Sequence, residues 1–245
     1  MSLKSPDPLP VMPDDVGGRK GIWAWSEKAP ADVAYFLPMA VFLFFTWIGS
    51  QGHWLFPVSY VVKTLLTGAL LLLFWRRYTT VRWTHLGLGF LVGVVGLVQW
   101  VGMEKFLLHV WPHYPRLGAD IFDPTVQIQA ALPRYLFLAV RLLGPVLVVP
   151  VMEELFWRDF LWRSIEAPND FKMVEVGTWD RNAVVLVTLL FASVHIQWMT
   201  AIVWGLMIVW LLLRTKSLGA CIVAHATTNL LLGVYVLASK DWMFW

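Results

Sequence analysis

The amino-acid sequence predicts an all-α fold, a polytopic transmembrane helical bundle with about seven spans. Of its 245 residues, 58% are hydrophobic and 14% are charged, whereas an average soluble domain has roughly 25% charged residues. The mean hydropathy is +0.64. Apolar runs that are long enough to cross a bilayer recur from about residue 33 to residue 238. Because these runs leave too little polar surface for a globule in water, the composition excludes a soluble enzyme.

Charged or turn-forming residues separate the apolar runs from one another. We expect spanning helices over about residues 33–48, 55–75, 86–103, 132–157, 183–197, 199–213 and 218–238. The mixed connection over residues 104–133 is expected to lie on the membrane surface, and an eighth span would require it to enter the membrane. In the third run, Gly89 and Gly93 have the spacing with which small residues let two helices approach closely.

Lysine and arginine residues gather in alternate connections, as the positive-inside rule requires. The connections that are rich in lysine and arginine are residues 1–32, 76–82, 158–181 and 214–216. We therefore expect these connections and the N-terminus to lie in the cytoplasm. The formal net charge is only +3 and is spread over these clusters, so no nucleic-acid partner is expected.

The single cysteine, Cys221, excludes an internal disulfide and a cysteine-based zinc cluster within one chain.

Ionisable residues inside spanning helices are functional candidates, because placing one there costs about 2.5 to 3.5 kcal/mol. Glu154 and Arg158 are four residues apart and can form an ion pair, while Glu153 is turned about 100° away without a local partner. A desolvated carboxylate without a partner is a good base for activating water. Pro150 would free a backbone carbonyl and kink the helix near the acids. The alternative is that both acids merely end a spanning helix at the membrane surface.

Two histidines and an amide lie in the later apolar runs. His195 is placed toward the end of the fifth run, where it could simply be a hydrogen-bonding group between helices. His225 and Asn229 are four residues apart on one face of the last run, with small residues between them that leave room for a helix or a substrate backbone. The alternative is a buried polar clamp. Together with Glu153, these residues supply a base, its orienting partner and donors for an oxyanion, as hydrolysis requires.

Lys63 and Arg141 are the remaining candidates, and the sequence assigns neither of them a role. Either could extend its long side chain to the membrane interface.

The ordered motifs Glu-Glu-x-x-x-Arg, Phe-x-x-x-His and His-x-x-x-Asn resemble those of the CAAX-protease and bacteriocin-processing family of intramembrane endopeptidases. They are formed here by Glu153, Glu154 and Arg158, by Phe191 and His195, and by His225 and Asn229. The resemblance covers about residues 132–238. The residues around the first motif and the ending over 241–245 are also similar to the CAAX prenyl protease-related branch, which is associated with bacterial exosortase sorting systems.

Composition, charge pattern and this resemblance together divide the chain, and the resemblance implies a bacterial location. Residues 1–32 would be a mobile cytoplasmic tail, 33–131 membrane-embedded helices with a surface loop, and 132–245 a CAAX-protease-like catalytic core. The protein would be an integral protein of the bacterial inner membrane. Its partners would be the lipid bilayer and a membrane-associated protein or peptide substrate, either lipidated or exosortase-sorted.

The resemblance also implies roles for the motif residues. Glu153 would activate the attacking water with help from His195, and His225 with Asn229 would hold the oxyanion. Glu154 with Arg158 would orient the site.

A glutamate and two histidines are also a ligand set for catalytic zinc. However, the chain has no His-Glu-x-x-His motif, and a zinc bound by Glu153 and both histidines would leave only Glu154 as the base. We therefore expect no cofactor and keep zinc as the alternative.

Two other functions would use the same polar residues. A scaffold or immunity protein would use them only to hold helices together. A proton or ion transporter would use them as a relay, although the candidates cluster toward helix ends and do not thread the membrane.

Overall fold

The fold is described from a computed structural model that covers Ser26, residues 28–116 and residues 121–245. Most of the expected N-terminal tail, residues 1–25 and 27, lies outside the described residues, as do residues 117–120 of the long connection. Throughout the described parts of the chain, all regular secondary structure is helical. This finding confirms the all-α prediction.

Six helices in the described ranges are long and apolar enough to cross a membrane. They are α2 (Ala31–Gly49), α3 (Phe56–Leu73), α4 (Leu86–Val110), the continuous stretch Ala131–Glu166, α10 (Trp198–Thr215) and α11 (Leu218–Ser239). The apolar helix α9 (Arg181–Ser193) is shorter than these six, and the six are consistent with the predicted bundle of about seven spans. The remaining helical pieces are η1 (Trp75–Arg77), α5 (Pro124–Gln127), η4 (Phe171–Met173) and η5 (Trp242–Phe244).

The fourth span is longer than predicted. It consists of α6 (Ala131–Leu143), η2 (Gly144–Val148), α7 (Val149–Glu153), η3 (Glu154–Leu161) and α8 (Trp162–Glu166). The expected helix end at residue 157 is therefore wrong, and so is the interpretation that the two acids end a helix. The cause is that the charges after residue 157 are paired inside the protein, since Arg158 binds Glu154 and Arg163 binds Asp159.

Two segments of this span, η2 and η3, have π-helical hydrogen bonding, in which each N–H bonds the carbonyl five residues earlier. At the end of η2 the Val149 N–H bonds the Gly144 carbonyl. The next N–H in this pattern would belong to Pro150, which has none. The carbonyl of Pro145 is thereby left without its partner in the helix and is free to bind a side chain.

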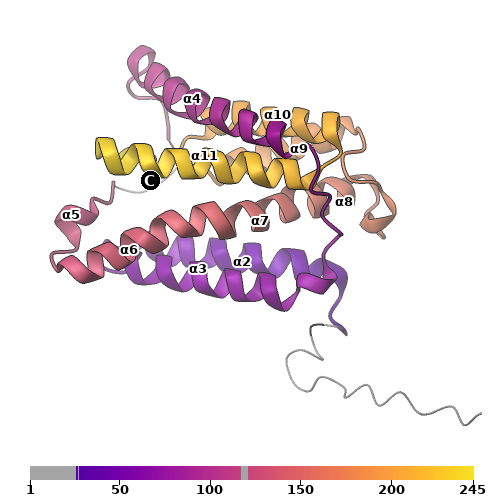
Figure 1. Cartoon of the computed structure of the whole chain (residues 1–245), viewed down its shortest axis with the longest axis horizontal. Coiled ribbons are helices and arrows are strands. Elements are labelled where there is room, and N and C mark those ends of the chain that lie inside the picture. Colours follow the sequence, from indigo (N-terminus) through magenta and orange to yellow (C-terminus); the bar gives the residue numbers. More distant parts are fainter. Residues whose placement is uncertain (1–25, 27, 117–120) are drawn as a thin grey trace, which may run out of the picture.

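The long helix occupies the middle of the bundle. Figure 1 shows its α6 and α7 parts between the α2–α3 pair and α11, with α4, α9 and α10 beyond α11. Neighbouring residues of η2 and α7 lie close to α11 on one side, and α7 lies close to α2 on the other. This arrangement places Glu153, the last residue of α7, in the interior of the bundle.

Helices α4 and α11 run side by side at very close range (Figure 1). A Cβ atom added to Gly89 would lie 2.5 Å from the carbonyl oxygen of Ala220, and one added to Gly93 would lie 2.5 Å from the Cβ of Thr227. Real Cβ atoms do not approach so closely. The expectation that these glycines let two helices meet is confirmed, and their partner is the helix that carries His225 and Asn229.

We predict that Gly93→Ala destabilises the bundle by about 1–3 kcal/mol, because the new methyl group overlaps α11. Gly102→Ala on the same helix is the matched control, since nothing lies within 4 Å of its added Cβ. Alanine there should be neutral or stabilising by roughly 0.5–1 kcal/mol. Denaturant titration of the purified protein in detergent measures both changes. Equal effects at the two positions would contradict the close contact.

Candidate active site

A cavity of about 290 Å³ lies within the bundle, and its wall is formed by residues of α2, α3, α4, the long helix, α9, α10 and α11 together with the C-terminal residues. Glu153, His195, His225 and Asn229, four of the six candidate residues, line it. Residues from the long helix, the 194–197 connection and α11 are thus brought to one place. Glu154 and Arg158 do not line the cavity and are buried behind its wall.

Glu153 is a buried acid with an unused oxygen. Its side chain is 5% exposed, and Oε2 has no hydrogen-bond partner among the described residues. A buried carboxylate oxygen without a donor is unusual and unfavourable. Since this residue faces the cavity, its free oxygen can accept a hydrogen bond from a water molecule or a substrate there.

Glu154 joins two helices. Its Oε1 accepts a hydrogen bond from the Arg158 guanidinium at 3.2 Å and lies 2.8 Å from Nδ1 of His225. Because a carboxylate only accepts, His225 donates from Nδ1. The ion pair that the spacing predicted is therefore present, and it also fixes the ring of His225 on α11. The opposite ring nitrogen, Nε2, is left for other partners.

Arg158 is held by aromatic rings as well as by Glu154. Its guanidinium carbon lies 4.5 Å from the centre of the Phe191 ring and 5.7 Å from that of Trp204. The two rings stack on each other with centres 5.4 Å apart, and Trp204 also contacts His225 at 4.6 Å. The spacing of the motifs gave no indication of Trp204, which lies on α10 outside all three of them.

His195 lies in the connection after α9, which ends at Ser193, and not within the helix as expected. Its Nδ1 is 2.7 Å from the carbonyl oxygen of Phe191 and donates to it, which satisfies one of the last carbonyls of the helix. The ring packs against Phe191, with centres 4.3 Å apart. Neutral His195 therefore presents Nε2 as an acceptor, and Glu153 is among its charged neighbours.

Asn229 binds the carbonyl that Pro150 leaves free. Its Nδ2 donates to the oxygen of Pro145 at 2.7 Å. This bond connects α11 to η2 and fixes the amide plane at the cavity wall. Since an amide nitrogen carries two hydrogens, one N–H remains for a ligand in the cavity.

Lys63 and Arg141 line the same cavity. The expectation that Lys63 reaches the membrane interface is wrong, because its side chain is only 6% exposed and its Nζ donates to Oγ1 of Thr46 at 2.9 Å. Arg141 is partly buried, with its guanidinium 4.4 Å from the centre of the Tyr60 ring. The charge of each residue within a span was visible in the sequence, but its position in the cavity was not.

Glu104 is a second buried acid, and it differs from Glu153 in being fully paired. Its two oxygens accept hydrogen bonds from Tyr114 and from Thr200, the latter at 2.9 Å. Burial and the bond to Glu104 raise the pKa of Tyr114 above its usual value. The sequence did not single out Glu104. Because both of its carboxylate oxygens accept hydrogen bonds, Glu104 has a structural role.

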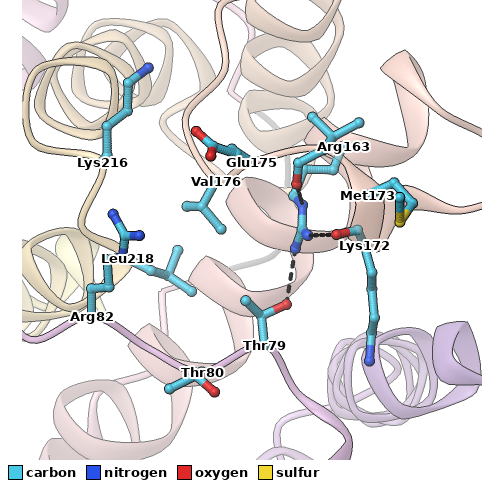
Figure 2. Close-up of a pocket in the computed structure, with 11 residues that line it drawn as sticks. Thr79, Thr80, Arg82, Arg163, Lys172, Met173, Glu175, Val176, Lys216 and Leu218 are labelled. Carbon is cyan, nitrogen blue, oxygen red and sulfur yellow. Dashed lines mark hydrogen bonds between the residues drawn. The ribbon is translucent and has the colours of Figure 1, made fainter.

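A larger cavity of about 430 Å³ lies between the 79–82 segment, the 172–176 segment and the start of α11. Figure 2 shows Arg163 in its wall, donating to Oγ1 of Thr79 at 2.9 Å and to the carbonyl of Lys172 at 3.0 Å. The ammonium of Lys216 donates to the Gly177 carbonyl. These cations already serve the fold, so we place the candidate active site in the smaller cavity.

The described residues form no group of three or more His, Cys, Asp or Glu side chains that could hold a metal ion. Glu154 is occupied by Arg158 and His225, and His195 uses Nδ1 for a backbone carbonyl. Each histidine therefore keeps Nε2 for a further partner.

Residues 135–231 match a family model described as Type II CAAX prenyl endopeptidase Rce1-like. This range contains all six candidate residues and extends from α6 into α11. No curated protein and no solved structure gives a significant match to the chain. The six long apolar helices and the match of residues 135–231 to a CAAX endopeptidase model support an integral membrane protein with a segment similar to that family.

Proposed function

We propose that this protein is an intramembrane endopeptidase in which Glu153 activates a water molecule to hydrolyse a peptide bond of a membrane-associated substrate. The observation that carries the proposal is the unpartnered, buried oxygen of Glu153 on a cavity shared with two histidines and an amide. This constellation lies within the range that matches the endopeptidase family.

In the proposed reaction, Glu153 accepts a proton from water while the water oxygen bonds to the peptide carbonyl carbon. His195 assists by accepting a hydrogen bond from the same water at Nε2. The tetrahedral oxyanion receives hydrogen bonds from Nε2 of protonated His225 and from the second N–H of Asn229. The carbon–nitrogen bond then breaks, and the proton held by Glu153 moves to the leaving nitrogen. The reaction is proposed to require no metal.

Glu154 and Arg158 are proposed to act as positioning residues. For Nε2 of His225 to donate, the ring must be protonated, because Nδ1 already donates to Glu154. The Glu154 carboxylate accepts the Nδ1 hydrogen bond and so orients the ring. Arg158 in turn balances the buried charge of Glu154. Removing a single oxyanion donor typically lowers a rate about 10²- to 10³-fold.

The depth of the site supports a membrane-associated substrate. His225 lies seven residues along α11 from its start at Leu218, or roughly 10 Å along the axis. We further propose that the N-terminus is cytoplasmic, that the protein resides in a bacterial inner membrane, and that it serves the exosortase-associated branch. Its substrate would then be a lipidated or exosortase-sorted protein.

The experiment compares membrane and secreted peptides of cells that carry the intact protein with those of cells that carry Glu153→Gln. Glu166→Gln is the matched control, because Glu166 is exposed at the end of the same long helix. Defined fragments should disappear only in the Glu153 variant, and they identify the substrate. Unchanged fragments with a persisting phenotype would instead indicate a scaffold.

A further inference from the structure

Two cations that the proposed reaction does not use lie on the wall of the active-site cavity. Lys63 comes from α3 and Arg141 from α6. Both contact the ring of Tyr60, with Nζ of Lys63 at 4.5 Å and the guanidinium carbon of Arg141 at 4.4 Å from its centre. Arg141 also lies 4.9 Å from the ring of Phe56. The two positive charges are therefore concentrated around one aromatic side chain.

Neither cation has an acidic partner in the described part of the chain. Lys63 donates to the Thr46 hydroxyl, and the polar partner of Arg141 is the Tyr60 hydroxyl. No described carboxylate lies within 4.0 Å of either group. The charged neighbours of Lys63 are Arg141, which repels it, and Glu153. Two like charges in an apolar cavity are unfavourable unless an anion binds them.

Helix packing alone does not explain these residues. A methionine or leucine would fill the same volume without the desolvation cost of a charge. By contrast, Glu104 is a buried charge whose two oxygens are both bound by hydroxyl groups.

Arg141 and Glu153 lie at separate points of one cavity wall. Arg141, Pro145, Val149 and Glu153 all line the cavity and follow one another every four residues, so they form one face of the long helix. Twelve residues of helix correspond to about 18 Å along the axis. An extended peptide covers about 3.3–3.6 Å per residue. After allowing for the reach of the side chains, about three to five peptide residues separate the two sites.

We propose that Lys63 and Arg141 form a subsite for a substrate carboxylate, about three to five residues from the bond that is cleaved. This inference rests on the proposed protease function and names its substrate class. The carboxylate is either the free C-terminus of the peptide or an Asp or Glu side chain. The Arg141 guanidinium can bind both carboxylate oxygens, and the Lys63 ammonium adds a point charge.

The test measures peptide binding to the full-length Glu153→Gln protein in detergent, so that binding does not depend on cleavage. The probes are a pool of apolar heptapeptides, each made as the C-terminal acid, as the C-terminal amide, and as the amide with one internal Asp. Peptides retained with the protein are quantified by mass spectrometry. The Arg141→Gln and Lys63→Met changes are added separately, and Arg214→Gln, at an exposed position of α10, is the control.

The acid form, the Asp form or both should be retained about 10- to 100-fold better than the plain amide. The form that is favoured identifies the source of the carboxylate. Each cavity variant should reduce this preference to a few-fold or less, while Arg214→Gln preserves it. Equal retention of all three forms would overturn the proposal, as would a preference that survives both cavity variants.

Cleavage by the wild-type protein separates this proposal from the proposed function. If acid forms bind preferentially but no peptide is cut, the carboxylate subsite stands and the protease assignment fails. If acid and amide forms are bound and cut equally well, with cleavage lost in Glu153→Gln, the protease stands and the subsite fails.

Discussion

Replacing Glu153 by glutamine is expected to lower kcat about 10²- to 10⁴-fold, the range for losing a general base, without loss of stability. The side chain keeps its shape, but an amide cannot accept the proton of water. Because the Oε2 atom of Glu153 has no partner, the substitution breaks no hydrogen bond at that atom and removes a buried charge. Residues that are poorly satisfied in the fold are often retained for function.

Glu104→Gln is the matched control, because it makes the same change at a buried glutamate whose oxygens are both bound. It should destabilise the protein by about 1–3 kcal/mol, since the new amide nitrogen faces a hydroxyl donor. Denaturant titration and peptide cleavage in detergent measure stability and activity for both variants. A Glu153→Gln protein that is active, or that loses as much stability as the Glu104 variant, would show that Glu153 is structural.

The membrane architecture could be predicted from composition. An apolar run that crosses the bilayer must satisfy its backbone hydrogen bonds internally, and a helix does this. The limits of the long helix could not be predicted. Arg158, Asp159 and Arg163 look like a polar connection in the sequence, yet their charges are paired inside the bundle. Helix α4 is likewise longer than expected, because Glu104 is satisfied by Tyr114 and Thr200. Pairing with distant residues decides whether a charge ends a helix.

The site was predictable where it depends on spacing along one helix. The Glu154–Arg158 pair and the separate position of Glu153 follow from helical geometry. The bond from His225 to Glu154 and the bond from Asn229 to the Pro145 carbonyl depend on how helices pack. The same holds for Lys63 and Arg141, whose charges gave no indication that they share a cavity with the acids.

The Arg158→Met variant is expected to lose about 3–5 kcal/mol of stability, the usual cost of leaving a buried charge without its partner. Arg158 is 1% exposed and Glu154 is fully buried, so water cannot replace the lost interaction. Methionine retains contact with Phe191 and Trp204, so packing is largely preserved. The loss would then come mainly from Glu154, which keeps only His225 as a partner.

A second change should recover this stability. In the double variant Glu154→Gln with Arg158→Met the buried negative charge is gone, and most of the lost free energy of unfolding should return. Activity should remain low in the double variant, because His225 then no longer has a carboxylate as the partner of its Nδ1. Denaturant titration of the single and double variants gives the coupling between the two sites. If the double variant were no more stable than Arg158→Met, the uncompensated charge of Glu154 would not be what destabilises the single variant.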